Sequence, residues 1–158
     1  MRPIYFSGSI SGGRGDLEIY RRLVELLKAH GFQVNAGEVT SAEVGVGGSP
    51  LESPEVFERD LRWIEEVARA GGALIAEVTT PSHGVGYEIA TARWRFGIPV
   101  VALFRPASGR RCSAMIAGDP GIHLVEYDED DLEAAIDRTV ACLREAHPSA
   151  PAGDAALQ

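Results

Sequence analysis

The sequence predicts an α/β fold built on a doubly wound, five-stranded parallel sheet. Strand and helix signals alternate along the chain, and alternation with short connections favours parallel strands joined by right-handed crossovers. Two strand candidates, 73–78 and 98–104, are nearly continuous apolar runs, which is typical of strands covered on both faces. The length of 158 residues suits one domain, and 45% hydrophobic with 24% charged residues is the balance of a globular protein.

A β-α-β unit opens the chain. The run Pro3-Ile4-Tyr5-Phe6-Ser7 predicts the first strand, and the glycine-rich stretch 8–15 predicts a loop. Apolar residues then recur every three or four positions, which predicts a helix with Asp16 at its N-cap that ends near His30. Residues 32–35 predict a short second strand.

A long segment rich in glycine, 36–52, separates the second strand from the next helix. We expect a long mobile loop here, and long loops in compact domains are often functional lids. The triplet Ser53-Pro54-Glu55 predicts a helix start with Ser53 at the N-cap and Pro54 at the first position. This helix is expected to end near Ala70, before the strand 73–78.

The second half of the chain continues the alternation. We expect a turn at 79–86, a helix at about 85–96, a strand at 98–104, a loop at 105–109, a helical turn at 113–116, a strand at 122–127 and a helix at about 130–145. Residues 1–147 are therefore expected to form a single domain of the Rossmann or flavodoxin-like type. The Ala/Pro/Gly-rich residues 148–158 are expected to be a disordered tail.

Charge and composition exclude several classes of partner. A net charge of -8 and a pI near 5.0 argue against a nucleic-acid backbone as the main partner. No run of 18 apolar residues exists, and the first residues lack a signal-peptide layout, so we expect neither a membrane span nor export. Two cysteines, Cys112 and Cys142, form neither a disulfide framework nor a metal-binding spacing, which favours free thiols in the cytoplasm.

Ligands of such sheets bind at the carboxyl ends of the strands, which directs attention to the segments that follow them. The segment Ser7-Gly8-Ser9-Ile10-Ser11-Gly12-Gly13 follows the first strand, and its backbone N–H groups suit an oxyanion. It matches neither the dinucleotide pattern nor the triphosphate pattern, so a single phosphate site and a plain surface loop both stay open.

The segment 79–88 is the most informative stretch. Gly84 and Gly86 are expected to let the chain turn from strand to helix, and Glu88 is expected in the first turn of that helix. The helix dipole would there favour the ionised carboxylate, which could act as a nucleophile, as a base or as a ligand for a sugar hydroxyl. Position alone also fits a glutamate that interacts only with the dipole.

Other candidates carry weaker signals. Asp60 lies at the edge of the apolar stripe of its helix, where pairing with an arginine such as Arg59 or Arg62 is the alternative to a functional role. Tyr5 in the first strand carries no functional weight alone. A further group could suit a phosphate or form a solvated loop: Ser108, Arg110, Arg111 and Ser113. His83 and His123 lack partners at metal-ligand spacing, so no metal is expected.

Taken together, four blocks resemble the 2'-deoxynucleoside 5'-phosphate N-hydrolases, relatives of the nucleoside 2-deoxyribosyltransferases. The similarity covers about residues 3–145, and four blocks in the same order are more specific than any one of them. The blocks are Tyr5-Phe6-x-Gly8-Ser9-Ile10-x-Gly12-Gly13-Arg14, Asp60-Leu61-x-Trp63, Ala76-Glu77-Val78-Thr79-x-Pro81-Ser82-x-Gly84-Val85-Gly86-Tyr87-Glu88 and Phe104-Arg105-Pro106-x-Ser108-Gly109-Arg110-x-x-Ser113-Ala114-Met115-Ile116.

The resemblance implies residue roles. Glu88 matches the family's nucleophile, Tyr5 and Asp60 match residues that assist it, and Ser82 matches the phosphate-binding serine. The transferases carry an acid six residues before the nucleophile, so a serine there supports a phosphorylated substrate. Ser113 matches a serine contributed by the neighbouring subunit, which implies a homodimer with shared sites. The substrate-binding set is Ser7, Gly8, Ser9, Ile10, Ser11, Gly12, Gly13, Ser82, Gly84, Gly86, Ser113, Ala114 and Met115.

The implied activity is hydrolysis of the N-glycosidic bond of deoxynucleoside monophosphates through a covalent deoxyribosyl–glutamate intermediate, without a cofactor or metal. Ile10 could exclude the 2'-hydroxyl of a ribonucleotide by apolar packing. Two family positions differ, because Ser11 replaces an arginine and Gly37-Glu38 stands where a histidine follows the second strand. The alternatives are a deoxyribosyltransferase and a nucleotide-binding sensor without turnover.

Overall fold

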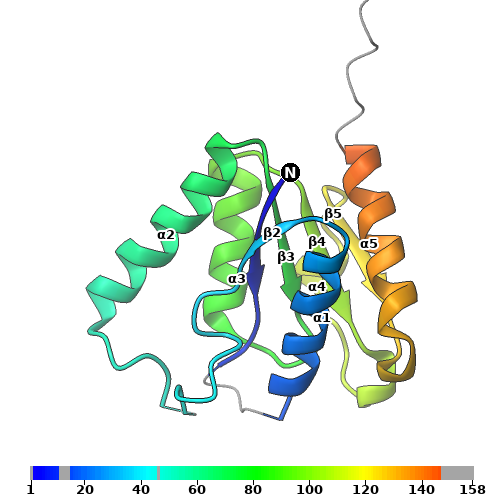
Figure 1. Ribbon diagram of the computed structural model, residues 1–158, viewed down its shortest axis with the longest axis horizontal. Helices are drawn as coiled ribbons and strands as arrows, with labels where there is room; N and C mark the ends of the chain where they lie inside the picture. Colours follow the sequence, from blue (N-terminus) through cyan, green and yellow to red (C-terminus); the bar gives the residue numbers. More distant parts are fainter. Residues whose placement is uncertain (1, 11–14, 46, 147–158) are drawn as a thin grey trace, which may run out of the picture.

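A computed structural model describes residues 2–10, 15–45 and 47–146 (Figure 1). Its five strands form one parallel sheet in the order β2-β1-β3-β4-β5, which confirms the predicted doubly wound fold. The strands are β1 (Pro3–Ser7), β2 (Gln33–Asn35), β3 (Ala73–Glu77), β4 (Val100–Phe104) and β5 (Ile122–Glu126). The expected tail and the site candidates Ser11, Gly12 and Gly13 lie outside the described residues.

Helices cover both faces of the sheet. The helices are α1 (Leu17–Ala29), α2 (Ser53–Arg69), α3 (His83–Ala90) with a π-helical continuation (Thr91–Arg95), α4 (Ala114–Ala117) and α5 (Leu132–Ala146). One hydrophobic core joins α1 and α5 to the sheet, and the other joins α2 and α3 to its opposite face. No helix within the described ranges is long and apolar enough to cross a bilayer.

Strand β1 distributes its side chains between these two cores. Ile4 and Phe6 belong to the core beneath α1 and α5, whereas Tyr5 belongs to the core beneath α2 and α3. Successive side chains of a strand point to opposite faces, so Ser7 shares the face of Tyr5. The sheet order reverses beside β1, where the ends of β1 and β3 meet, and this switch point is where ligands of such folds bind.

Two predicted helix starts differ from the structure, and a third, that of α1, has its predicted N-cap residue without the expected side-chain bond. Asp16 stands at the N-cap of α1 but makes no capping hydrogen bond with its side chain. The N-cap of α2 is Glu52, which forms a capping box with Glu55, so Ser53 is the first helical residue rather than the cap. Helix α3 begins at His83 instead of near Val85.

The early start of α3 has a clear cause. The Ser82 Oγ atom accepts a hydrogen bond from the Val85 N–H group, and this side-chain cap fixes the first turn. Gly84 and Gly86 therefore lie inside the helix, and their predicted role in a strand-to-helix turn is wrong. The segment 36–52 forms neither helix nor strand where it is described, as expected for a loop, although Val39 is buried.

Candidate active site

Glu88 lies in the second turn of α3, not in the first turn as the sequence suggested. Its side chain reaches the end of β1, where two hydroxyl groups donate to its carboxylate. The Tyr5 hydroxyl donates to Oε1 at 2.7 Å, and the Ser7 hydroxyl donates to Oε2. Both oxygens of Glu88 therefore have a fixed donor, which orients the carboxylate.

The environment of Glu88 overturns the predicted electrostatics. Burial raises the pKa of the Glu88 carboxyl above its ordinary value, while the hydrogen bonds from Ser7 and Tyr5 oppose that rise. The expected stabilisation of the ionised form by a first-turn helix dipole is wrong because Glu88 lies deeper in the helix. Burial, followed by the nearby Glu88 charge, also raises the pKa of Tyr5, so this phenol stays a hydrogen-bond donor.

Asp60 supplies a second carboxylate from α2. Its Oδ1 atom pairs with the Arg59 guanidinium at 2.9 Å, so the alternative derived from the sequence, an arginine partner, is present. Burial raises the pKa of the Asp60 carboxyl, and Arg59 opposes this effect. Asp60 nevertheless lines the same cavity as Glu88, so its pairing with Arg59 does not remove it from the site.

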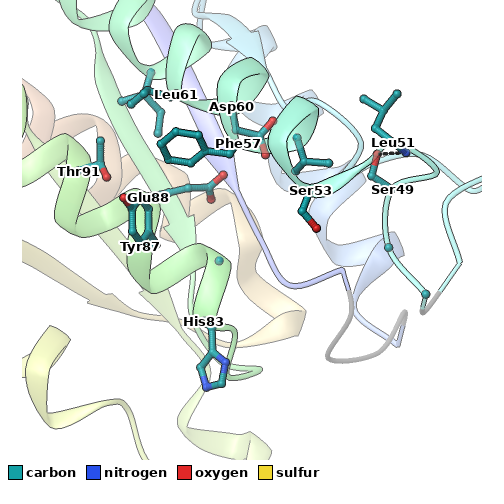
Figure 2. A pocket seen from close by; sticks show the side chains of 15 residues that line it. Ser49, Leu51, Ser53, Phe57, Asp60, Leu61, His83, Tyr87, Glu88 and Thr91 are labelled. Carbon is teal, nitrogen blue, oxygen red and sulfur yellow. Dashed lines mark hydrogen bonds between the residues drawn. The ribbon is translucent and has the colours of Figure 1, made fainter.

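Two adjoining cavities surround these carboxylates. One of about 510 Å³ is lined by Tyr5, Gly8, Ile10, Glu38, Arg59, Asp60, Trp63, Ser82, Gly84 and Glu88, among others. The second, of about 610 Å³, shares Asp60 and Glu88 and extends toward Phe57 and Tyr87. Figure 2 shows Asp60 entering the second cavity from α2 and Glu88 entering it from α3. Each volume is in the range that holds a small ligand.

Several predicted binding residues lie near the carboxyl ends of β1 and β3. Gly8 lies so close to its neighbours that an added Cβ would be 3.0 Å from Val39 and 3.1 Å from Tyr20. A larger residue at this position would therefore press on Val39 and Tyr20. Ile10 lines the cavity beside Tyr5, while Ser9 is completely buried.

The segment Ser113-Ala114-Met115 does not reach Glu88 within one chain. Ser113 and Met115 line a separate cavity of about 370 Å³, together with Gly86, and Met115 is 84% exposed. Ser82 lines both this cavity and the one that holds Glu88. Thus the two cavities are neighbours on either side of the start of α3.

A charged link between α2 and the 36–52 segment was missed from the sequence. Arg59 contacts Glu38 at 3.2 Å, and its guanidinium lies 4.7 Å from the centre of the Trp63 ring. The Ser49 hydroxyl donates to Glu38 at 3.1 Å. The contacts fasten two parts of the loop to the helix that carries Asp60. The adjacent Arg59 was the available signal, but its partner Glu38 lies 21 residues away in the sequence.

Other polar candidates lie elsewhere. Ser108 and Arg110 line a small cavity with Asp16 and Arg105, apart from Glu88. His83 borders the cavities described above, whereas His123 belongs to β5. In the described part of the chain, no group of three or more histidine, cysteine and carboxylate residues is arranged to hold a metal ion.

The geometry suits covalent chemistry at a carbon atom. A carboxylate with both oxygens oriented by hydrogen bonds can attack an electrophilic carbon or stabilise a developing positive charge. A second carboxyl group in the same cavity can exchange protons with the leaving group or with water. Glu88 and Asp60 are the two carboxyl groups whose positions fit these roles.

Curated relatives extend over most of the chain. The 5-hydroxymethyl-dUMP N-hydrolase of Homo sapiens is 40% identical over 143 residues, covering 87% of this chain and 79% of the relative. The putative 2'-deoxynucleoside 5'-phosphate N-hydrolase 1 of Trichoplax adhaerens is 36% identical over 143 residues, covering 87% and 92%. The protein with the same name in Nematostella vectensis is 37% identical over 136 residues, covering 83% and 88%. No protein-family model matches the chain.

Proposed function

Because the chain belongs to the family of 2'-deoxynucleoside 5'-phosphate N-hydrolases, we propose that it hydrolyses the N-glycosidic bond of a 2'-deoxynucleoside 5'-monophosphate. The products are a free base and 2-deoxyribose 5-phosphate. The observation that carries this proposal is the Glu88 carboxylate, which Tyr5 and Ser7 orient inside a cavity shared with Asp60 and Ser82.

In the first step, an oxygen of Glu88 attacks the anomeric carbon C1' while the bond from C1' to the base nitrogen breaks. The base leaves with the electron pair of that bond and takes up a proton. The transition state resembles an oxocarbenium ion, which the Glu88 charge stabilises before it forms the ester bond. We assign the donation of this proton to Asp60, which lines the same cavity and whose pKa is raised by burial and lowered by Arg59.

In the second step, a water molecule attacks C1' and the bond from C1' to Glu88 breaks. Asp60, now ionised, takes the proton from that water, which returns both carboxyl groups to their starting states. A 2-deoxy sugar favours both steps because it lacks the electron-withdrawing 2'-hydroxyl. Ile10, which lines the cavity beside Tyr5, is assigned to exclude that hydroxyl.

The phosphate is assigned to the start of α3 and to the glycine-rich segment after β1. Ser82 caps α3 and lines the cavity that holds Glu88. A helix start offers unpaired N–H groups and a positive dipole end, and glycines allow an oxyanion to approach the backbone closely. A serine at position 82 adds no negative charge to repel the phosphate.

The neighbouring cavity supports a homodimer. Ser113 and Met115 lie beside Ser82 but apart from Glu88 within one chain. We assign this segment to the partner's active site, with Ser113 shared across subunits. The cytoplasm is the compartment we assign, because both cysteines are free thiols and the substrate is a nucleotide.

The test is chromatography of free base released from the four common deoxynucleoside monophosphates and from 5-hydroxymethyl-dUMP. GMP and deoxyguanosine serve as controls for the 2'-hydroxyl and for the phosphate. Base release from deoxynucleotides alone supports the proposal. Formation of a swapped nucleotide when a different free base is added would instead establish a transferase, and tight binding without base release would establish a sensor.

A further inference from the structure

A buried charged network lies beside the proposed phosphate site, at the carboxyl ends of β3 and β4. Its centre is Arg105, which directly follows β4 and is 6% exposed. The guanidinium donates to Asp16 at 2.5 Å and to Glu129, and its Nε atom lies 3.7 Å from the completely buried Glu77. None of these residues lines the cavity that holds Glu88.

Asp16 is used in an unusual way. Aspartate at an N-cap normally accepts hydrogen bonds from the first backbone N–H groups of its own helix, which stabilises the helix by about 1 kcal/mol. Asp16 occupies the N-cap of α1 but makes no such bond. Its Oδ1 atom instead accepts from Arg105, and its Oδ2 atom accepts from the Thr80 hydroxyl at 2.8 Å. The carboxylate therefore joins three segments of the chain.

One of the joined segments leads into the proposed phosphate site. Thr80 lies two residues before Ser82, the cap of α3, and Asp16 stands at the start of α1. We propose that Arg105, Asp16 and Thr80 are positioning residues that fasten the segment before Ser82 to the start of α1 and to the end of β4, and so hold Ser82 in place at the phosphate. This inference rests on the proposed function, because it assigns a role to residues that support that site without touching substrate.

Arg105 is held in turn by β3 and β5. Its backbone N–H group donates to the Thr79 hydroxyl at 2.9 Å, and the same hydroxyl donates to Glu77. The Tyr127 hydroxyl donates to Glu77 at 3.1 Å, and the Arg105 guanidinium lies 5.9 Å from the centre of the Tyr127 ring. The rigid sheet thus fixes Arg105, and Arg105 fixes Asp16.

Substitution of Arg105 is a poor test, because it would leave buried carboxylates such as Glu77 without a counter-charge and could unfold the protein. Thr80→Val is sharper, since it removes one hydrogen bond to Asp16 and keeps the shape of the side chain. The control is Tyr127→Phe, which removes a hydroxyl bond to Glu77 but keeps the ring against Arg105 and leaves Glu77 bound to Thr79, so the contacts of Arg105, Asp16 and Thr80 are retained.

The expected result for Thr80→Val is a rise of about tenfold in the KM for a deoxynucleoside monophosphate, with kcat within about twofold of the wild type. The dissociation constant of 2-deoxyribose 5-phosphate, measured by calorimetry, rises by the same factor, while Tyr127→Phe leaves both constants unchanged. Asp16→Asn keeps a hydrogen-bond acceptor but loses the charge. It should also raise the KM and the dissociation constant of 2-deoxyribose 5-phosphate.

Three results would overturn the inference: an unchanged KM in Thr80→Val, an equal loss of kcat and affinity, or an equal effect of Tyr127→Phe. The calorimetric measurement of 2-deoxyribose 5-phosphate binding distinguishes failure of this inference from failure of the proposed function. If wild-type protein released no base, the proposed activity would fail, and the binding of 2-deoxyribose 5-phosphate to each variant would still decide whether the network positions a phosphate site.

Discussion

The hydroxyl of Ser7 is expected to set the pH at which Glu88 becomes active. Ser7→Ala removes one of the two hydroxyl donors to the Glu88 carboxylate. A hydrogen bond to an ionised group contributes about 1.5–3 kcal/mol, and about 1.36 kcal/mol corresponds to one pKa unit. The pKa of Glu88, already raised by burial, should therefore rise further in Ser7→Ala, and kcat/KM on the acid side of the profile should fall by about tenfold to a hundredfold.

The sign of the effect follows from the reaction. Glu88 attacks as a carboxylate, so kcat/KM falls as the pH drops through the pKa of Glu88. In Ser7→Ala this acid limb moves to higher pH, and activity recovers toward the wild-type value above it. The assay is the initial rate of base release at limiting substrate across the acid and neutral range. Ser7→Thr, which keeps a hydroxyl, should restore the wild-type profile.

A matched control removes a buried hydroxyl elsewhere. Thr139 is fully buried in α5 and donates to the Ala135 carbonyl, so Thr139→Val deletes a comparable group far from the site. Its acid limb should coincide with that of the wild type. An acid limb that stays in place in Ser7→Ala, or moves to lower pH, would refute the reasoning that this hydroxyl stabilises ionised Glu88.

Three further predictions concern specificity and stability. Ile10→Ser should raise the activity on ribonucleotides relative to deoxynucleotides, and an unchanged ratio would rule out a role for Ile10 against the 2'-hydroxyl. Ser82→Asp keeps a good N-cap for α3 but adds a negative charge that repels the phosphate. The kcat/KM for the nucleotide should therefore fall by about tenfold or more, while the thermal midpoint of unfolding is unchanged. Ile75→Ala, at a completely buried position of β3, should lower the free energy of unfolding in urea by about 2–5 kcal/mol, and a smaller loss would contradict the tight packing of this strand.

The sheet was predictable because its signals are local. Continuous apolar runs mark β3 and β4, and the alternation of strands and helices leaves few topologies for a parallel sheet. Helix starts were less predictable, because the cap depends on which residue leaves the helical backbone conformation. Glu52 is not a favoured capping residue type, yet its reciprocal bonds with Glu55 make it the cap of α2.

The resemblance supplied the candidate site residues, but it did not supply their physical environment. The start of α3 at His83 moves Glu88 into the second turn, where burial and not the helix dipole dominates its pKa. The partners of Glu88 lie 83 and 81 residues away along the chain, at Tyr5 and Ser7. Pairings over such distances depend on the tertiary fold, so local sequence patterns cannot reveal them.

Asp16 shows the same limit at another position. Its residue type and place predict a capping role, and the sequence gives no sign that its carboxylate bonds to Arg105 and Thr80 instead. The competing bonds prevail because a buried guanidinium needs a carboxylate partner more than a helix end needs its cap. Such bonds join segments that only the tertiary fold brings together, so the local sequence does not reveal them.

Glu88 is the residue that we assign as the nucleophile in cleavage of the glycosidic bond. The most direct test compares free-base release from deoxynucleoside monophosphates by the wild type and by Glu88→Gln, which preserves the size of the side chain. We expect base release by the wild type and none by Glu88→Gln, with the thermal midpoint of the variant showing that it is folded. Base release by folded Glu88→Gln at the wild-type rate would contradict this assignment.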